Sequence, residues 1–305
     1  MENTRGDRVT RRYVGLFSVY AGDRPSALFS SLWTMLRYQS RPLDRAVGVI
    51  EGELTTELEL VVAHFTNEVE WIRIPRVQNR LSFGLPTALN AGLTAISSED
   101  VVLKIDTDDL YPPCRVALTL EAFEAQPALG IFGGQVDEWD EHFAVFKGSR
   151  SVPLAHQEIF RYGKKRNPFN GPTVAFTAGL ARELGGFAHV GANEDYVLWA
   201  SILQSGAYAQ NSPEVLAYMR GGTDLVARRS TVRTRKGELE ALRAIRKLGY
   251  FNAPTYILHV LVKQLVRRMP LQLNLYLYQR LRQGGTRPIP RVVAHAAQAL
   301  TEWQP

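Results

Sequence analysis

The apolar residues of this chain fall into short runs that alternate with longer segments of helical periodicity. Each short run is bounded by glycine, proline or charged residues and has the length of a buried strand. Strands are expected over residues 13–20, 46–50, 69–74 and 101–105. Between them, apolar side chains recur at three- and four-residue spacing, which is typical of amphipathic helices. Helices are expected over residues 25–36, 55–65 and 85–96. This alternation predicts an α/β fold with a parallel sheet and right-handed crossovers.

The C-terminal third of the chain is largely helical by pattern. A short helix is expected over residues 196–203, and a longer amphipathic helix over residues 256–269 is stopped by Pro270. Residues 271–281 are again rich in leucine and tyrosine. The expected organisation is a disordered N-terminus over residues 1–12, an α/β domain over residues 13–230 and a basic helical extension over residues 231–305.

The fourth expected strand ends abruptly in a cluster of carboxylates. Asp106, Asp108 and Asp109 lie within four residues, and the two prolines at 112 and 113 prevent the strand from continuing. In an open α/β sheet, ligands bind outside the carboxyl ends of the strands. Crowded carboxylates repel one another unless a cation neutralises them, and their oxygens suit Mg²⁺ or Mn²⁺ bound together with substrate phosphates. The cluster therefore predicts a metal site, and a solvated acidic turn is the alternative.

Two other expected strands deliver polar residues to the same edge of the sheet. Tyr20 and Asp23 follow the first strand, and Glu51 ends the second. If these groups converge with Asp106, they form a crevice suited to a nucleotide. No glycine-rich dinucleotide motif follows the first strand, and the chain contains no P-loop sequence. A bound phosphate would therefore depend on a metal and on cationic side chains.

Composition narrows the class of protein further. The 305 residues include 36 Lys and Arg against 30 Asp and Glu, which gives a net charge of +6, and one cysteine, Cys114. A single cysteine excludes an internal disulfide framework and a multi-cysteine zinc site, and it fits a reducing compartment. Residues 1–12 lack the apolar core of a signal peptide, and no apolar run is long enough to predict a membrane span. We therefore expect a cytoplasmic protein.

The positive charge is concentrated near the C-terminus. Between Ala241 and Thr301 there are ten Lys and Arg and no Asp or Glu, so an anionic partner is expected for this region. A basic amphipathic helix such as residues 256–269 can lie on an anionic bilayer, here the inner face of the plasma membrane. The alternative is a helix that packs on the α/β domain with its charged face in water.

Seven short segments carry a resemblance to a known family. They are FSVY (17–20), EG (51–52), GLPTALNAGL (84–93), KIDTDD (104–109), RNPFNGPTV (166–174), LGGF (184–187) and NEDYVLW (193–199). In this order they resemble family 2 glycosyltransferases of GT-A fold, and among them the bacterial exopolysaccharide enzymes of the amylovoran-biosynthesis type. The resemblance implies a mixed sheet flanked by helices with a helical C-terminal extension. It also implies an inverting hexosyltransferase that moves a sugar from a nucleotide-sugar donor to a saccharide or lipid-linked saccharide in exopolysaccharide, capsule or O-antigen synthesis.

The same resemblance implies a role for the acids. Asp106 and Asp108 correspond to a D-x-D motif that holds the donor ribose and the metal, so Mn²⁺ or Mg²⁺ is the expected cofactor. Glu51 takes the place of an acid that contacts the nucleotide base. Asp195, with Glu194 beside it, corresponds to the catalytic base that deprotonates the acceptor hydroxyl. The residues expected at the nucleotide sugar are Ser18, Tyr20, Glu51, Asn90, Lys104, Asp106, Thr107, Asp108, Arg228 and Arg229.

Some of these residues also have an ordinary structural interpretation. An acidic pair such as Glu194 and Asp195 is common at a helix start, where the helix dipole favours negative charge. Arg228 and Arg229 could belong to a solvated basic linker. The chain also has Gly171 where relatives often carry histidine, so acceptor contacts can differ there.

Three other functions compete with the glycosyltransferase hypothesis. A nucleic-acid-binding protein would suit the basic charge, but the sequence has no helix-turn-helix, zinc or aromatic RNA-binding pattern, so no nucleic-acid partner is expected. A catalytically inactive scaffold of the same fold is disfavoured by the intact acids at 106, 108 and 195. A nucleotidyltransferase would require a glycine-rich phosphate loop after the first strand, and residues 21–24 (AGDR) do not supply one.

Overall fold

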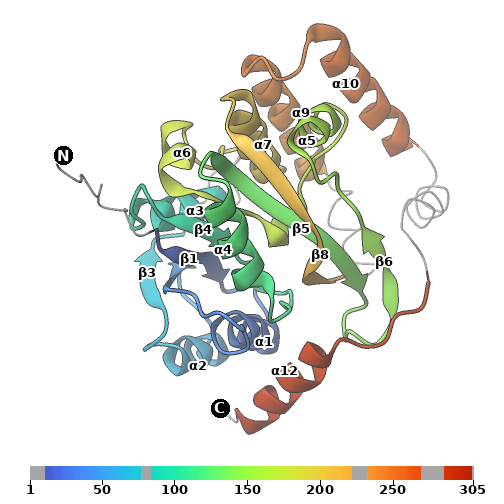
Figure 1. Cartoon of the computed structure of the whole chain (residues 1–305). Helices are drawn as coiled ribbons and strands as arrows, with labels where there is room; N and C mark the ends of the chain where they lie inside the picture. Colours follow the sequence, from blue (N-terminus) through green and yellow to red (C-terminus); the bar gives the residue numbers. More distant parts are fainter. Residues whose placement is uncertain (1–10, 77–83, 222–231, 269–284, 304–305) are drawn as a thin grey trace, which may run out of the picture.

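A single mixed sheet with helices on both faces forms the body of the protein (Figure 1). The computed structural model describes residues 11–76, 84–221, 232–268 and 285–303. The strands are β1 (Tyr13–Tyr20), β2 (Arg45–Glu51), β3 (Glu70–Ile74), β4 (Val101–Lys104), β5 (Leu129–Trp139), β6 (Phe146–Arg150), β7 (Ala175–Thr177) and β8 (Tyr208–Arg220). Their order is β3-β2-β1-β4-β7-β5-β6, and β8 pairs with β5.

Strand pairing changes from all-parallel to mixed at the middle of the sheet. The four strands β1 to β4 are mutually parallel wherever they pair, as the sequence pattern predicts. Strand β7 is antiparallel to both β4 and β5, whereas β5 and β8 are parallel. The mixed sheet of the predicted fold class is therefore confirmed. The chain moves outward from β1 to β3 and then returns to the other side of β1, which makes the β1/β4 junction the point where the strand order reverses and where such folds bind ligands.

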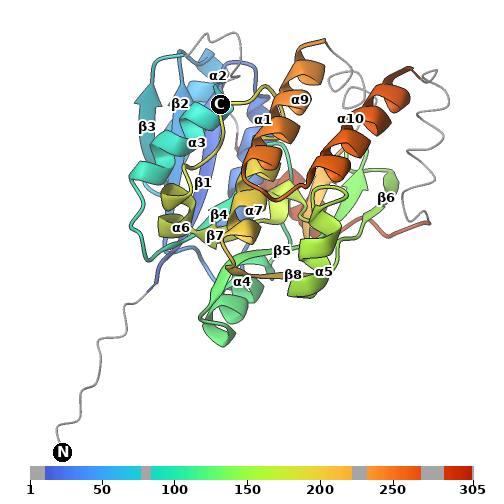
Figure 2. The same ribbon diagram turned by 90° about the horizontal axis from the view of Figure 1, so that it is seen from above.

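The helices form two layers around the sheet (Figures 1 and 2). They are α1 (Pro25–Leu36), α2 (Thr56–His64), α3 (Leu85–Thr94), α4 (Arg115–Ala125), α5 (His156–Gly163), the 3-10 turn η1 (Gly171–Thr173), α6 (Ala178–Glu183), α7 (Glu194–Gln204), α9 (Val232–Lys247), α10 (Ala253–Arg268) and α12 (Arg291–Glu302). Buried side chains of α1, α2 and α4 share one core, and those of α3, α6, α7 and α9 share the other.

Residue alternation along β1 explains why both faces of the sheet are covered. Val14 and Leu16 enter the core beneath α3 and α7, whereas Tyr13, Phe17 and Val19 enter the core beneath α1 and α2. Successive side chains of a strand point to opposite faces, so a strand that is apolar at nearly every position needs a helical layer on each side.

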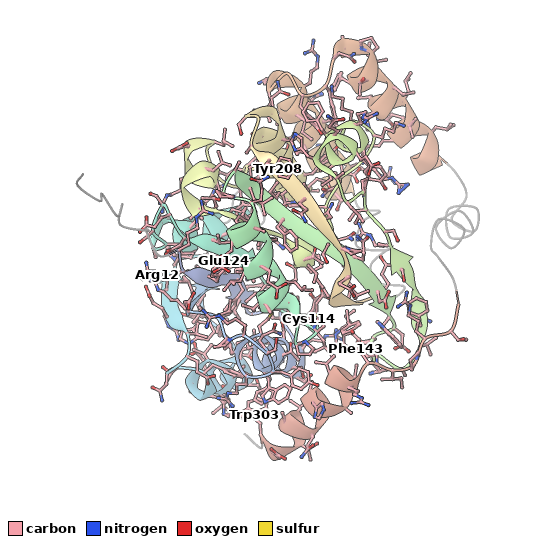
Figure 3. All side chains as sticks on the ribbon, viewed as in Figure 1. Arg12, Cys114, Glu124, Phe143, Tyr208 and Trp303 are labelled. Atoms are coloured by element: carbon pink, nitrogen blue, oxygen red, sulfur yellow. The ribbon has the colours of Figure 1, made fainter. Side chains whose placement is uncertain are left out.

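The C-terminal helices pack against the α/β body at two separate places. α9 lies against α7, and its Gly237 is so close to the backbone of Gly191 that an added Cβ would lie 2.2 Å from the Gly191 carbonyl carbon. α12 returns to α1, where Trp303 stacks on Phe29 with ring centroids 4.7 Å apart (Figure 3). The predicted helix at 256–269 is α10, which begins at Ala253. Residues 1–10 of the expected disordered N-terminus and the leucine-rich residues 271–281 lie outside the described residues.

The Trp303 contact predicts that the last described helix contributes to the stability of the α/β body. We expect Trp303→Ala to lower the free energy of unfolding by about 2 kcal/mol, because it removes a half-buried aromatic stack. Gln298→Ala is the matched control: its side chain meets only Glu302 on the exposed face of the same helix, and its change should stay within about 0.5 kcal/mol. Urea unfolding of both full-length variants tests this, and equal midpoints would contradict it.

Candidate active site

A buried lysine connects the end of β4 with the start of α7. Lys104 is the last residue of β4 and lies on the same face as Val102, which is the face covered by α7. Its ammonium group forms an ion pair with Asp106. Burial opposes the lysine charge, but Asp106, together with Asp195 and Glu194, raises the pKa of Lys104 above its ordinary value. One buried cation therefore lies within electrostatic reach of two groups of acids that are about ninety residues apart in sequence.

The acidic pair at the start of α7 is partly buried and closely held. The amide nitrogen of Tyr196 donates to Asp195 Oδ1 at 2.6 Å, and Asn167 Nδ2 donates to Asp195 Oδ2 at 3.3 Å. Burial raises the pKa of Asp195, whereas Lys104 lowers it. Burial and the charge of Asp195 raise the pKa of Glu194 to about 7. Two adjacent carboxyls with raised pKa values are suited to accept a proton near neutral pH.

Two backbone positions beside this acidic pair are unusual. Gly171 lies so close that an added Cβ would be 3.3 Å from Asp195 Oδ2. Asn193, just before α7, has a left-handed backbone with φ of 60°, which is uncommon outside glycine and is found more often at functional sites. A side chain at position 171 would therefore crowd the Asp195 carboxylate, and glycine avoids this contact.

The turn after β4 is fixed by the end of β8. The backbone nitrogen of Arg220 donates to Asp109 Oδ1 at 2.9 Å, and Arg220 Nε donates to the carbonyl oxygen of Asp108 at 3.0 Å. The guanidinium group itself lies over the ring of Phe143, 4.6 Å from its centroid (Figure 3). Asp109 is buried by these contacts, whereas Asp108 is exposed to solvent. The last two carboxylates of the cluster therefore have different tasks: Asp109 anchors the turn, and Asp108 lies where a ligand can reach it.

The loop after β1 places another acid, Asp23, beside this turn. Asp23 Oδ2 accepts from the backbone nitrogen of Tyr20 at 3.0 Å, which closes the loop after β1. Burial and the charge of Asp108 raise the pKa of Asp23 to about 7. Burial and the charges of Asp108 and Asp106 likewise raise the pKa of Asp109. The carboxylates at the β1/β4 junction therefore repel one another, as the sequence pattern suggested.

This excess of negative charge fits a divalent cation. Asp106 is partly exposed and Asp108 is exposed, so both can offer oxygens to an ion. No group of three or more His, Cys, Asp or Glu is arranged as a complete metal cage within the described ranges. An ion at this position would be coordinated by one or two protein carboxylates and otherwise by phosphate and water. Mg²⁺ is typically bound in this way.

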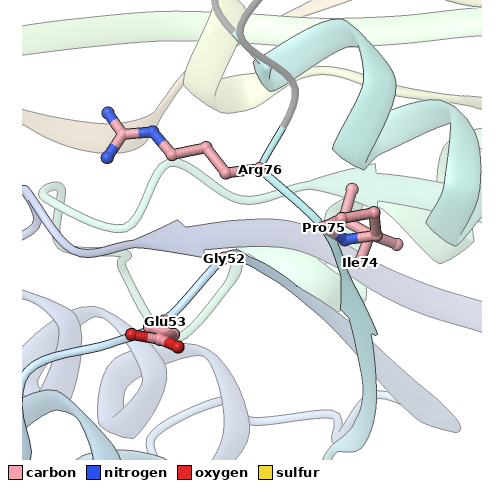
Figure 4. Close-up of a pocket in the computed structure, with 5 residues that line it drawn as sticks. All are labelled: Gly52, Glu53, Ile74, Pro75 and Arg76. Carbon is pink, nitrogen blue, oxygen red and sulfur yellow. The ribbon is translucent and has the colours of Figure 1, made fainter.

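A second part of the site lies at the ends of β2 and β3. A pocket of about 640 Å³ is lined by Gly52, Glu53 and residues 74–76 (Figure 4). The buried carboxylate of Glu51 lies beside it against Gly84, the residue that precedes α3. Gly84 has φ of +81°, and an added Cβ there would be 1.9 Å from Glu51 Oε2, so only glycine fits. The pocket begins at the residue after Glu51, the acid for which the family resemblance implies a contact with the nucleotide base.

The remaining residues predicted at the nucleotide sugar differ in their burial and contacts. Ser18 is half-buried and Tyr20 exposed at the end of β1, and Thr107 is half-buried in the turn between Asp106 and Asp108. Asn90 holds a loop instead of facing the carboxylates: its Nδ2 donates to the carbonyl of Phe187 at 2.9 Å, and the nitrogen of Phe187 donates to its Oδ1 at 2.8 Å. Arg228 and Arg229 lie outside the described residues.

Three basic residues of the site were missed by the sequence-based prediction. Arg220 organises the Asp108–Asp109 turn, and Arg150 at the end of β6 lowers the pKa of Asp195. Arg115 is fully buried under the cluster, where it donates to the carbonyl of Lys104 and stacks on Tyr111 at 4.2 Å. The only sequence signal for Arg150 and Arg220 is a charged residue at the end of a strand, which is common on any surface.

The fold and the clustered acids together define a class: an α/β protein whose strand order reverses at the β1/β4 junction, beside a group of carboxylates. Solved structures agree on the fold. The chain superimposes with a TM-score of 0.55 on the mannosyltransferase PcManGT from Pyrobaculum calidifontis in complex with GDP-Man and Mn²⁺, at 16% identity and over 96% of this chain and 88% of that one. It matches Staphylococcus aureus TarS 1–349 with a TM-score of 0.55, at 13% identity over 78% and 65% of the two chains. These likenesses show that the fold is GT-A-like.

Relatives with similar sequences extend the comparison from fold to family. No protein-family model matches the chain. It is 33% identical over 264 residues to an uncharacterized glycosyltransferase of Haemophilus influenzae, covering 87% of this chain and 96% of that protein. It is 30% identical over 272 residues to the amylovoran biosynthesis glycosyltransferase AmsE of Erwinia amylovora, covering 88% and 98%. A third relative, at 26% over 272 residues, is the Escherichia coli UDP-Gal:alpha-D-GlcNAc-diphosphoundecaprenol beta-1,3-galactosyltransferase, with 89% and 97% covered.

The chain belongs to this family of bacterial glycosyltransferases, as its motifs predicted. It is therefore an enzyme of the transferase class, and its similarity extends along nearly the whole length of these relatives.

The raised pKa of Glu194 predicts a pH-dependent effect on stability. Its ordinary value is 4.5 and its folded value is about 7, so the native protein keeps a proton that the unfolded chain releases, and stability falls as the pH rises through this window. Glu194→Gln removes that cost. We expect it to stabilise the protein by about 1–3 kcal/mol at pH 8 and to have little effect at pH 4.

Glu158→Gln, at an exposed acid in the first turn of α5, is the matched control. It should change the free energy of unfolding by less than about 0.5 kcal/mol at either pH. Chemical denaturation at several pH values measures both variants, and a Glu194→Gln effect that is the same at pH 4 and pH 8 would contradict the assignment.

Proposed function

We propose that the chain is an inverting family 2 glycosyltransferase that moves a sugar from a nucleotide-diphosphate donor to a lipid-linked saccharide during bacterial surface-polysaccharide synthesis. The names of two relatives, one for amylovoran biosynthesis and one for a diphosphoundecaprenol-linked acceptor, support the class of product and acceptor. The observation that carries the proposal is Lys104, a buried cation shared by Asp106 on the donor side and by Glu194 and Asp195 on the other. Residues 13–230 form the catalytic domain, and residues 231–305 form the extension.

The donor occupies the β1/β4 junction. Its base enters the pocket beside Glu51. Tyr20 and Ser18 line the path to this pocket. The diphosphate of the donor lies over the turn of Asp106, Thr107 and Asp108. Arg228 and Arg229, which lie outside the described residues, are assigned to the diphosphate from the family resemblance alone. A divalent metal, Mn²⁺ or Mg²⁺, held by Asp106 and Asp108, would stabilise the negative charge on the departing diphosphate. The structural neighbour PcManGT was solved in complex with GDP-Man and Mn²⁺, which supports this choice of ligand and ion.

Asp195 acts as the base. Its carboxylate takes the proton of the acceptor hydroxyl while that oxygen forms a bond to the anomeric carbon and the bond from this carbon to the diphosphate breaks. The electron pair of the broken bond leaves with the nucleoside diphosphate, and attack from the opposite side inverts the anomeric centre. Tyr196 and Asn167 orient the carboxylate. Burial raises the pKa of Asp195 and so makes the carboxylate more basic, whereas Lys104 opposes this shift.

Metal-dependent donor binding through Asp108 is the first consequence. We expect Asp108→Asn to weaken the binding of UDP or GDP in the presence of Mn²⁺ by about 1 kcal/mol or more, because one charge-assisted contact is lost. Glu99→Gln is the matched control, since Glu99 is an exposed acid at the opposite end of the same strand. Isothermal calorimetry with and without EDTA measures this. Unchanged affinity in EDTA or in Asp108→Asn would rule out the proposed metal site.

Loss of Asp195 should separate chemistry from donor binding. A panel of nucleotide sugars with Mn²⁺ or Mg²⁺, assayed by release of the nucleoside diphosphate, first identifies the donor. With that donor and an acceptor, we expect Asp195→Asn to slow transfer by about 10²–10⁴-fold while the donor Kd changes little, because the variant keeps the shape and loses only the proton acceptor.

Glu194→Gln provides the comparison, since it neutralises the adjacent acid. If Glu194→Gln loses activity and Asp195→Asn does not, the base is the other carboxylate. If the wild-type protein releases no nucleotide from any donor, or if neither variant slows transfer, the proposed mechanism is wrong and a non-catalytic scaffold becomes the better explanation.

A further inference from the structure

Helix α10 exposes a ridge of large aliphatic side chains. The ridge consists of Ile257, Leu258, Leu261, Val262 and Leu265, with exposed fractions of 54%, 61%, 61%, 48% and 61%. Their spacing of one, four, five and eight residues places them on one side of the helix, and Figure 1 shows α10 at the edge of the molecule away from the sheet. Large exposed aliphatic residues gathered on one face mark an interaction surface.

The opposite side of α10 is the one that packs on the body. Tyr256 and Val260 contact the core beneath α7 and α9. His259 stacks on Phe251 with ring centroids 4.8 Å apart, and Lys263 pairs with Glu238 of α9 at 3.3 Å. The alternative of a helix that packs on the α/β domain with its charged face in water is met only in its packing, because His259 and Lys263 face the body and the leucines face solvent.

Positive charge lies along one flank of α10, between the ridge and the body. The carbonyl of Lys164, just after α5, is bonded to His259 Nε2 at 2.8 Å, which brings the exposed basic segment Lys164, Lys165 and Arg166 to this flank. The helix itself contains no acidic residue. Apolar residues directed outward beside exposed cations are the pattern of a helix that lies in the interface of an anionic bilayer.

The basic segment also leads directly to the catalytic pair. Asn167 follows Arg166, and its amide donates to Asp195. The surface formed by α10 and residues 164–166 is therefore linked to the Asp195 carboxylate through Asn167.

We propose that the ridge of α10, together with the basic segment 164–166, docks the enzyme on the surface of an anionic lipid bilayer and presents Asp195 to an acceptor anchored there. The acceptor part of this inference rests on the proposed function. α10 lies on the bilayer and does not cross it: among the residues described, no helix combines the length and hydropathy needed for a span. A second copy of the chain is the less suitable occupant, because pairing two such surfaces would bring two basic segments together.

Vesicle flotation of the full-length protein tests the docking surface without any assay of activity. We expect binding to vesicles of phosphatidylglycerol and phosphatidylcholine, weaker binding to phosphatidylcholine alone, and a loss of binding as salt is raised from about 0.1 M to about 0.5 M. Equal binding to both kinds of vesicle, or binding to neither, would overturn the proposal.

Variants of the ridge localise the effect. Leu258→Gln with Leu261→Gln should lower the vesicle partition coefficient at least tenfold, on the order expected for withdrawing two leucines from an apolar environment. Lys164→Gln with Lys165→Gln should lower it about tenfold on anionic vesicles only. The matched control is Val145→Gln with Ile289→Gln, two exposed aliphatic residues elsewhere, which should bind as the wild type does.

Two further measurements distinguish bilayer docking from a failure of the proposed reaction and from self-association of the protein. Turnover with a water-soluble acceptor should be unchanged in the leucine variant, so a failure of docking and a failure of the proposed reaction are distinguishable. Sedimentation velocity should show the same mass for wild type and leucine variant in the absence of lipid. A wild-type dimer that the leucine substitutions dissociate, without vesicle binding, would assign the ridge to a second copy and overturn the proposal.

Discussion

The site depends on the burial of one positive charge among several negative ones. Lys104 is enclosed at the end of β4, where an ammonium group without partners would be strongly destabilising, so the surrounding acids hold it in its charged form. In return, the lysine lowers the pKa of Glu194 and Asp195, which burial alone would raise further. The acids at the end of β4 and those at the start of α7 are thus electrostatically coupled, and a change in one group is expected to alter protonation in the other.

The backbone around this charge is fixed by contacts from distant parts of the chain. Arg220, at the end of β8, positions the turn that carries Asp108. Gly237 of α9 lies against the loop that starts α7, so the C-terminal extension supports the acidic pair as well as carrying the ridge of α10. α12 then closes on α1 through Trp303. α9 and α12 are therefore integral to the packing of the α/β body, one beside the loop before α7 and the other beside α1.

Much of the fold could be predicted from the sequence because its signals are local. Strand and helix periods, the proline at the start of α1 and the carboxylates that stop β4 are all set by neighbouring residues. The mixed second half of the sheet was implied only by family resemblance: β7 is three residues long, and β5 carries eleven consecutive buried residues, so neither shows an alternation that would reveal its antiparallel pairing.

By itself, the sequence determined that acids stand at a strand end and at a helix start, and that α10 is amphipathic. Only the tertiary structure decided that these acids share Lys104, that Asp109 is buried while Asp108 is exposed, and that Asn90 is bonded to the backbone of Phe187. It also decided which face of α10 meets the protein and left the leucines outside. The reason is physical: these outcomes depend on contacts between residues many positions apart, and a local pattern states which side chains are apolar without stating what they will touch.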